Sequence, residues 1–76
     1  MKNIVLPDLG EGIEKGTVSL SYVKEGDIVK EGDDIVELVT DKAAFNVPTE
    51  YAGRIQSLKV KQGQEVKIGD VLAVLE

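Results

Sequence analysis

The residue of this sequence that is best placed to do chemistry is a lysine between two apolar runs. Leu38-Val39 precedes the segment Thr40-Asp41-Lys42-Ala43 and Phe45-Asn46-Val47 follows it, so the segment is predicted to be the tip of a β-hairpin. Such a turn presents a primary amine on a rigid backbone, and acylation would replace its charge with a long flexible arm. Aspartate and lysine are also ordinary residues of exposed turns, so the turn alone indicates either an attachment point or a solvated loop.

The composition excludes most other chemistry. The 76 residues include no cysteine and no histidine, which removes disulfides, thiolate nucleophiles, the usual transition-metal ligands and the side chain best suited to acid–base catalysis near neutral pH. Aromatic residues make up only 4% of the chain, so the small core must be aliphatic. Asp41 and Lys42 form a poor acid–base pair, because an exposed tip offers neither burial nor a cleft. We therefore expect no catalysis by this domain alone.

The charge distribution indicates which classes of partner this chain can bind. The formal net charge is −5; residues 1–41 carry ten acidic and four basic side chains, and residues 42–76 carry four and five. Nucleic acids and anionic membranes require a basic face, so neither is expected as a partner. The acidic half could steer a basic protein or simply keep a small domain soluble. No apolar run approaches the roughly 20 residues that span a bilayer, and the first residues do not resemble a signal peptide, so we expect a soluble protein that is not secreted.

The sequence contains an internal repeat. Residues 23–39 and 60–76 align without a gap at a shift of 37, and eight of the 17 positions are identical. The similarity extends back to residues 16–18, which align with residues 53–55, and the first copy has four extra residues before Gly16. The chain is therefore two copies of one unit of about 37 residues.

Each copy has the pattern of β-strands. Residues 17–23 alternate polar and apolar side chains, as a strand with one solvated and one buried face must, and glycines separate the apolar runs. No amphipathic helix is indicated. The predicted strands are eight short segments near residues 3–7, 17–23, 28–30, 35–39, 43–48, 54–60, 65–67 and 71–75.

The repeat also predicts the architecture. Neither copy can bury its apolar face alone, so the two copies should pack face to face about a pseudo-twofold axis. The expected all-β fold is a flattened β-barrel or sandwich of two four-stranded antiparallel sheets, a barrel-sandwich hybrid. Because the turn around Lys42 joins the copies, the axis should place it at the opposite end of the domain from the termini. The predicted core consists of Val18, Leu20, Val29, Ile35, Leu38, Phe45, Val47, Ile55, Leu58, Val66, Leu72 and Val74.

Three segments carry a resemblance to a known family. They are LPDLGEGI at residues 6–13, VKEGDIVKEGD at residues 23–33, and TDKAAFNVP at residues 40–48 followed by Ala52-Gly53. Over essentially all of its length the chain resembles the lipoyl domain of the dihydrolipoamide acyltransferase component of 2-oxo-acid dehydrogenase complexes. The resemblance implies that Lys42 carries lipoic acid through an amide bond. It also implies that residues 1–76 form a single lipoyl domain, the N-terminal domain of a larger acyltransferase chain.

The resemblance implies a swinging-arm carrier that is not an enzyme by itself. A thiamine-diphosphate-dependent 2-oxo-acid decarboxylase would reductively acylate the arm, the acyltransferase core would pass the acyl group to coenzyme A, and dihydrolipoamide dehydrogenase would reoxidise the arm. A lipoate ligase or transferase would attach it. Tethering would raise the effective concentration of the reactive group at each active site. The isolated domain is expected to be a monomer, located in the cytoplasm of a bacterium or in the mitochondrial matrix of a eukaryote.

Recognition residues are implied by the same resemblance. Thr40, Asp41 and Ala43 flank the lysine in the family's pattern and would be recognised by the lipoylating enzyme or the decarboxylase. Val39 is a departure, since family members often carry an acidic residue there.

In the family, the loop that precedes the second strand lies beside the lipoyl turn and contributes to recognition, which here implies a role for Gly10, Glu11 and Gly12. A phosphate site in this loop is not expected, because the glycines do not form GxGxxG and no helix follows.

Other identities remain open from the sequence. A biotin carrier has a similar fold and also places its lysine at a hairpin tip, but that family typically has methionines on both sides of the lysine, and the only methionine here is Met1. Glycine-cleavage carriers also hold lipoate, but they resemble a longer chain with additional helices. A structural barrel-sandwich module without any modification, of the kind found in membrane-fusion proteins, would need no reactive lysine at the tip.

Overall fold

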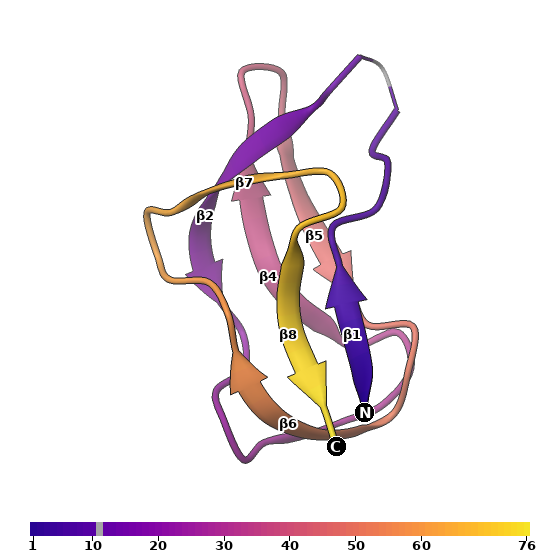
Figure 1. Ribbon diagram of the computed structural model, residues 1–76. Helices are drawn as coiled ribbons and strands as arrows, with labels where there is room; N and C mark the ends of the chain where they lie inside the picture. Colours follow the sequence, from indigo (N-terminus) through magenta and orange to yellow (C-terminus); the bar gives the residue numbers. More distant parts are fainter. Residues whose placement is uncertain (11) are drawn as a thin grey trace.

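The computed structural model describes residues 1–10 and 12–76, and the regular structure of this part of the chain is β-strand (Figure 1). Each of the eight predicted segments matches one observed strand, with ends that differ by no more than two residues. The strands are β1 (Lys2–Val5), β2 (Lys15–Ser21), β3 (Ile28–Val29), β4 (Asp34–Val39), β5 (Ala44–Pro48), β6 (Gly53–Leu58), β7 (Glu65–Lys67) and β8 (Val71–Leu75). In the described residues, no helix is long and apolar enough to cross a membrane.

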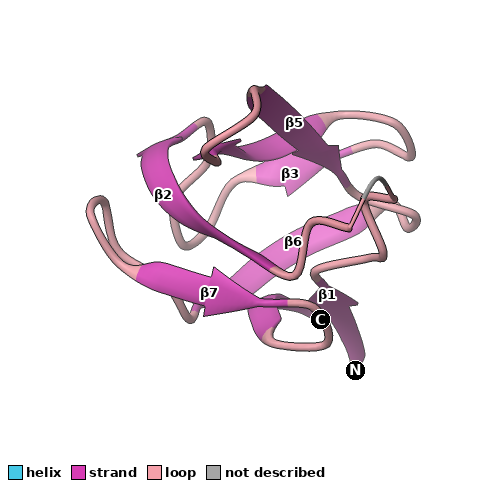
Figure 2. Ribbon diagram, turned by 90° about the horizontal axis from the view of Figure 1, so that it is seen from above, coloured by secondary structure: helices cyan, strands magenta, loops and turns pink. Residues whose placement is uncertain are grey.

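The strands form two four-stranded sheets with antiparallel pairing throughout. One sheet has the order β1-β8-β6-β3 and the other has the order β5-β4-β2-β7. In Figure 1, β1 and β8 lie in front of β4 and β5, and Figure 2 shows the strands from above with their connecting loops. A single cluster of aliphatic side chains fills the space between the sheets. The predicted sandwich of two four-stranded antiparallel sheets is confirmed.

The two copies of the repeat exchange strands. β1 and β3 come from the first copy and β6 and β8 from the second, yet all four belong to one sheet. Exchanging each strand for its counterpart in the other copy, β1 for β5, β2 for β6, β3 for β7 and β4 for β8, converts the order of one sheet into that of the other. The pseudo-twofold symmetry is therefore present. The expected face-to-face packing of two separate copies is wrong, because backbone hydrogen bonds within each sheet also join the copies.

The core is aliphatic, as predicted, but simple alternation misplaces some of its members. Leu20 is 37% exposed, and Phe45, Leu58 and Val74 are only partly buried. The register of β2 against β4 shifts between Val18 and Leu20, and such a bulge sets two residues against one on the partner strand. The shift turns Leu20 toward solvent. Phe45 lies on β5, an edge strand of its sheet, which leaves one side of its ring without a neighbouring strand.

Bulges also bury consecutive residues that alternation would assign to opposite faces. Ile35 and Val36 in β4 are both buried, and the pairing of β4 with β5 is irregular there. Leu72 and Ala73 in β8 are buried together as well. The buried apolar residues that the alternation did not predict are Ile4, Leu6, Ile13, Val36, Val60, Ala73 and Leu75.

Four tight turns of one design, two in each copy of the repeat, connect successive strands. They span Lys24–Asp27, Lys30–Asp33, Lys61–Gln64 and Lys67–Asp70. In each turn the backbone N–H of the fourth residue donates to the carbonyl of the lysine (2.9–3.1 Å), and the side chain of the fourth residue accepts from the lysine N–H (2.8–3.1 Å). The third residue is a glycine with φ between 88° and 95°, a conformation that other residues rarely adopt. The repeated glycines at positions 26, 32, 63 and 69 thus have a common structural cause.

Candidate functional site

The turn at residues 40–43, called the Lys42 turn from here on, is held together by the side chain of Thr40. Its hydroxyl donates a hydrogen bond to the Ala43 carbonyl oxygen (2.9 Å) and accepts from the backbone N–H groups of Lys42 (3.1 Å) and Ala43 (3.1 Å). The Thr40 N–H donates to the same Ala43 carbonyl (2.9 Å). One hydroxyl therefore uses its donor and both acceptor positions within the turn. Thr40, one of the predicted recognition residues, defines the backbone that carries Lys42.

Strands β4 and β5 hold the Lys42 turn at one end of the domain. Leu38 pairs with Phe45 next to the turn, and Leu38 and Val47 are buried in the core. Residues 41–43 are exposed. Figure 1 shows the β4–β5 connection at the top of the molecule and both chain termini at the bottom. The prediction that the turn lies opposite the termini is confirmed.

The loop between β1 and β2 lies beside the Lys42 turn. The Gly10 N–H donates to Asp8 Oδ1 (2.8 Å), the Ile13 N–H donates to the Gly10 carbonyl (3.0 Å), and Ile13 is only 5% exposed, which anchors the loop. Gly12 faces the same groove as the turn, so the predicted proximity is confirmed for this residue. Gly10 does not line the groove, and Glu11 lies outside the described residues.

An open groove of about 510 Å³, called the tip groove from here on, runs between this loop and the Lys42 turn. Its lining comes from the loop, β2, β7 and the end of β4 with its turn. The lining residues are Gly12, Ile13, Glu14, Lys15, Gly16, Thr17, Val39, Thr40, Asp41, Lys42 and Glu65. Within it, Lys15 Nζ lies 3.5 Å from Glu65 Oε2. The groove therefore joins three segments that are far apart in the sequence.

Gly16 permits close contact between β2 and the Lys42 turn. A Cβ atom at this buried position would lie 3.2 Å from Thr40 Cγ2 and 3.4 Å from the Val39 carbonyl oxygen. The methyl group of Thr40 cannot turn away easily, because the hydroxyl on the same Cβ makes three hydrogen bonds within the turn. Glycine at position 16 therefore sets the distance between β2 and the turn.

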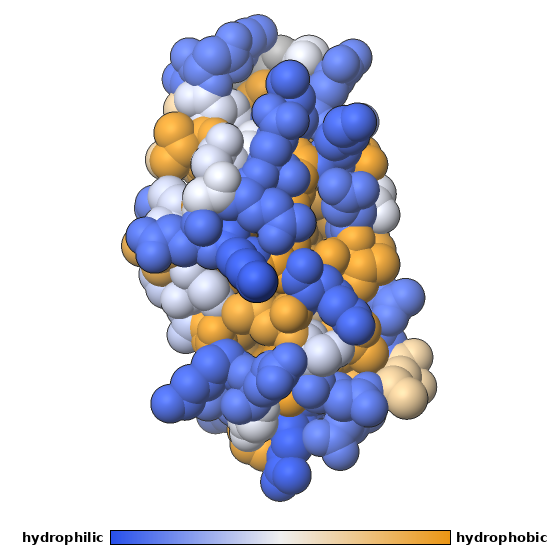
Figure 3. Space-filling view, turned by 60° about the vertical axis from the view of Figure 1, so that its left-hand side comes forward, coloured by the Kyte–Doolittle hydropathy of each residue, from blue (hydrophilic) through white to orange (hydrophobic). Residues whose placement is uncertain are grey.

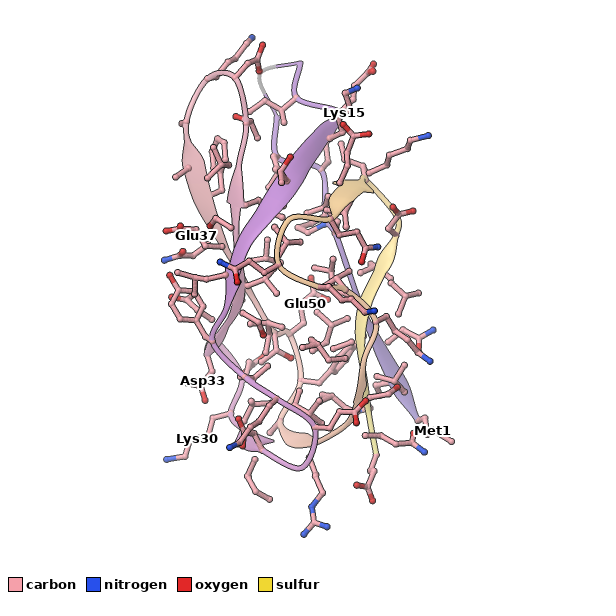
Figure 4. All side chains as sticks on the ribbon, turned by 90° about the vertical axis from the view of Figure 1, so that its left-hand side faces the viewer. Met1, Lys15, Lys30, Asp33, Glu37 and Glu50 are labelled. Atoms are coloured by element: carbon pink, nitrogen blue, oxygen red, sulfur yellow. The ribbon has the colours of Figure 1, made fainter. Side chains whose placement is uncertain are left out.

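The surface views place these residues in the whole molecule. In Figure 3 hydrophilic side chains cover both ends of the visible face, and apolar surface shows mainly between them. Figure 4 shows Lys15 toward the end of the domain that carries the hairpin tip, whereas Lys30 and Met1 lie toward the other end. The Lys42 end is thus a polar end.

Several residues of the tip groove were not predicted as site residues. Gly16 was noted only as one of the glycines between strands, and Lys15, Glu65 and Glu14 were not singled out at all. No local sequence signal marks them. Glu65 reaches the groove because Thr17 of β2 pairs with both Glu65 of β7 and Val39 of β4.

Comparisons with known proteins identify the family. The sequence family described as "Biotin-requiring enzyme" matches residues 2–75. The chain belongs to this biotin- and lipoyl-attachment family. A dihydrolipoyllysine-residue acetyltransferase component of the pyruvate dehydrogenase complex from Mycoplasma capricolum is 42% identical over 76 residues, which are 100% of this chain and 17% of that protein. The same component from Staphylococcus aureus is 34% identical over 71 residues, which are 93% of this chain and 16% of that protein. The chain thus spans about a sixth of these relatives.

Solved structures show the same fold. The lipoyl domain of the 2-oxoglutarate dehydrogenase complex from Azotobacter vinelandii has a TM-score of 0.74 and 33% identity, and the match covers 100% of this chain and 96% of that one. Urea carboxylase from Kluyveromyces lactis has a TM-score of 0.82 at 21% identity, covering 99% of this chain and 6% of that one, which shows the fold alone. The chain is therefore a lipoyl domain, and the biotin carrier is not favoured. Attachment at Lys42 stays a prediction.

Proposed function

We propose that Lys42 is the lipoyl attachment site and that this lipoyl domain is the swinging arm of a 2-oxo-acid dehydrogenase complex. The observation that carries the proposal is the position of Lys42. It is an exposed residue of a turn that Thr40 holds rigid, at the opposite end of the domain from both termini. A group on its Nζ atom would point away from any chain that continues beyond the domain.

The surroundings of Lys42 fit a lipoyl amide. The lysine supplies a primary amine on an exposed turn, and the buried residues of β4 and β5 keep that turn at a constant position. A bound lipoyl group supplies a dithiolane whose sulfur–sulfur bond opens and closes during acyl transfer. The domain contributes a rigid base, so that the movement is confined to the arm and the reactive end stays at high local concentration.

The partners belong to the same proposal. A lipoate ligase or transferase would modify Lys42, a thiamine-diphosphate-dependent decarboxylase would load the arm, the acyltransferase core would unload it, and dihydrolipoamide dehydrogenase would reoxidise it. We propose further that residues 1–76 are the N-terminal lipoyl domain of a longer acyltransferase, which agrees with the 17% share of the Mycoplasma capricolum relative that the chain covers. Such a complex would lie in the bacterial cytoplasm or the mitochondrial matrix.

A modification assay tests this function. The purified domain is incubated with ATP, lipoate and a lipoate ligase, and in parallel with ATP, biotin and a biotin ligase; intact mass and peptide mapping then locate any adduct. We expect one lipoyl adduct on Lys42 and none with biotin. A biotin adduct alone would identify a biotin carrier. The absence of both adducts would favour an unmodified structural module.

A further inference from the structure

A second open groove, called the acidic groove from here on, lies away from the Lys42 turn. It has a volume of about 400 Å³ and lies over β3 and the two tight turns that flank this strand. Its lining residues are Tyr22, Val23, Asp27, Ile28, Val29, Asp33 and Asp34. Figure 4 shows Asp33 toward the end of the domain opposite Lys15, so a partner in this groove would leave the Lys42 turn uncovered.

The acidic groove presents two large apolar side chains to solvent. Ile28 is 70% exposed and Tyr22 is 46% exposed. The Tyr22 hydroxyl donates to Asn46 Oδ1 (2.9 Å), and Asn46 Nδ2 donates to Asp34 Oδ2 (3.2 Å). These hydrogen bonds hold the tyrosine against β5 and β4. An aromatic ring that is already held in place loses little conformational freedom when a partner packs on it.

The three carboxylates of the groove keep the capacity to bind a cation from outside the domain. Oδ2 of Asp27 and Oδ2 of Asp33 each accept a backbone N–H within their turns (2.9 Å), and Oδ2 of Asp34 accepts from Asn46. A carboxylate has a second oxygen that can accept further hydrogen bonds. In residues 1–10 and 12–76, no group of three or more histidine, cysteine or acidic side chains could hold a metal ion. A cationic side chain is therefore the fitting ligand.

The basic side chains near the groove do not cancel its charge. Residues 22–34 carry five acidic and two basic side chains, and the basic ones are Lys24 and Lys30. Arg54 of β6 pairs in register with Ile28, and its Nε lies 4.0 Å from Glu76 Oε2, so this charge is already offset. A partner that approaches β3 therefore meets a net negative surface.

The internal repeat shows that the fold does not require the exposed apolar residues. A shift of 37 relates residues 22–34 to residues 59–71, which have the same strand and the same two turns. Lys59 takes the place of Tyr22 there, and Glu65 takes the place of Ile28. Glu65 forms part of β7 as Ile28 forms part of β3. The strand thus forms equally well with a charged residue at this position.

The carboxylates of the groove are not required by the fold either. Asp27 accepts the Lys24 N–H at 2.9 Å, and in the second copy Gln64 accepts the Lys61 N–H at 3.1 Å. A neutral side chain therefore closes the same turn. Residues 59–71 carry two acidic and three basic side chains, against five and two in residues 22–34. The combination of negative charge and exposed apolar surface belongs to the first copy alone and has no structural cause.

We propose that the acidic groove is a docking site for a segment of another protein in which arginine alternates with aliphatic residues. The proposal goes beyond the carrier function and does not depend on lipoyl attachment. Charge complementarity selects a basic partner. An arginine can stack on the Tyr22 ring and pair with Asp34, and an aliphatic side chain can cover Ile28. An apolar centre with a charged rim is the usual anatomy of a protein–protein interface.

Peptide titrations followed by NMR test this docking site. The unmodified, ¹⁵N-labelled domain is titrated with a short synthetic peptide in which arginine alternates with leucine. Two further peptides of the same length serve as controls, one with glutamate in place of arginine and one with serine in place of leucine. We expect the first peptide to shift the amide signals of residues 22–34 and not those of residues 59–71 or 40–43. It should bind about ten-fold more tightly than either control peptide.

One pair of variants isolates the apolar contact. Ile28→Thr removes the exposed aliphatic side chain, keeps a β-branched residue and leaves the charge unchanged. Ile68→Thr makes the same change at an isoleucine that is 39% exposed and does not line the groove. We expect Ile28→Thr to weaken binding of the arginine–leucine peptide about three- to ten-fold and Ile68→Thr to leave it unchanged.

A second pair of variants isolates the charge. Asp33 and Asp70 occupy the fourth position of the same kind of turn, one in each copy, and each accepts the N–H of its lysine. Asp33→Asn and Asp70→Asn remove one charge each and keep an oxygen that can accept this hydrogen bond. We expect Asp33→Asn to weaken peptide binding about two- to five-fold and Asp70→Asn to have no effect. The difference should shrink as NaCl rises, because salt screens exposed charges.

Four results would overturn the inference. Equal effects within either pair of variants would show that the groove is not the binding site. Equal binding of the serine peptide would show plain attraction to an acidic surface. Unchanged signals of residues 22–34 at millimolar peptide would leave these residues as a solvated surface. Shifts of the same signals on raising the domain concentration without peptide would assign the groove to a second copy. The domain is unmodified throughout, so none of these results affects the function proposed for Lys42.

Discussion

The Lys42 turn differs in construction from the four tight turns at residues 24–27, 30–33, 61–64 and 67–70, called the glycine turns from here on. Each of the five turns contains an exposed lysine. In the glycine turns the lysine is the first residue, and the side chain of the fourth residue binds its N–H. In the Lys42 turn the lysine is the third residue, and the side chain of the first residue binds the N–H groups of the third and fourth. The glycine turns need a positive φ, and the Lys42 turn contains no glycine.

This difference shows why exposure alone does not mark a functional lysine. Lys24, Lys30, Lys61 and Lys67 are all exposed, but each begins a short connection from a strand of one sheet to the next strand, which belongs to the other sheet. Lys42 lies at the end of a hairpin, beyond the last residue pair of β4 and β5. A modifying enzyme can approach such a tip without contacting the flanks of the domain. The position within the turn, and of the turn within the fold, distinguishes the two kinds of lysine.

The largest expected effect is the loss of modification in Lys42→Arg. Arginine keeps the charge and the exposed position but has no primary amine, so the variant should fold normally and gain no lipoyl mass in the ligase assay. Lys30→Arg is the matched control in a glycine turn and should leave lipoylation unchanged. A lipoyl adduct on the Lys42→Arg domain would show that another amine is the acceptor.

A smaller effect, on stability, is expected in the glycine turns. Gly32 has a φ of 93° and open space around the position of a Cβ atom, so Gly32→Ala adds backbone strain without a steric clash. We expect a loss of about 1–2 kcal/mol in the free energy of unfolding, measured by urea denaturation. The lipoylation rate should stay the same, because the turn is remote from Lys42.

Glu31→Ala is the control for this substitution, since it changes the neighbouring residue of the same turn without a positive φ. If Gly32→Ala were as stable as Glu31→Ala, the glycine would not be required by the backbone. If Gly32→Ala instead slowed lipoylation, the two kinds of turn would be less independent than their construction indicates.

The smallest effect concerns the contact between β2 and the Lys42 turn. Gly16→Ala should lower the free energy of unfolding by about 1 kcal/mol, because its methyl group would lie 3.2 Å from Thr40 Cγ2. Thr40→Ser removes that methyl group and keeps the hydroxyl, so Gly16→Ala should cost less in the Thr40→Ser background. We expect a coupling of about 0.5 kcal/mol in a double-mutant cycle measured by urea denaturation. Strictly additive effects would mean that Gly16 does not position the turn.

The strands and the turn could be predicted because their signals are local. Alternation of side chains located the eight strands, and the repeat located the symmetry. Leu20 was wrongly predicted to be buried, and Phe45, Leu58 and Val74 are only partly buried, because bulges and edge positions depend on the partner strand. The same limit applies to the site. Thr40 and Asp41 are next to Lys42 in the sequence, whereas Glu65 reaches the tip groove only through the pairing of β7 with β2.

The sequence by itself determined which residues form strands, which glycines form turns and which lysine lies at a hairpin tip, because these depend on side-chain period and local backbone conformation. Only the tertiary structure decided that the two copies exchange strands and that Gly16 approaches Thr40. It also brought Glu14, Lys15 and Glu65 around the Lys42 turn. These features follow from long-range strand pairing, in which each partner strand satisfies backbone hydrogen bonds that no local segment can satisfy.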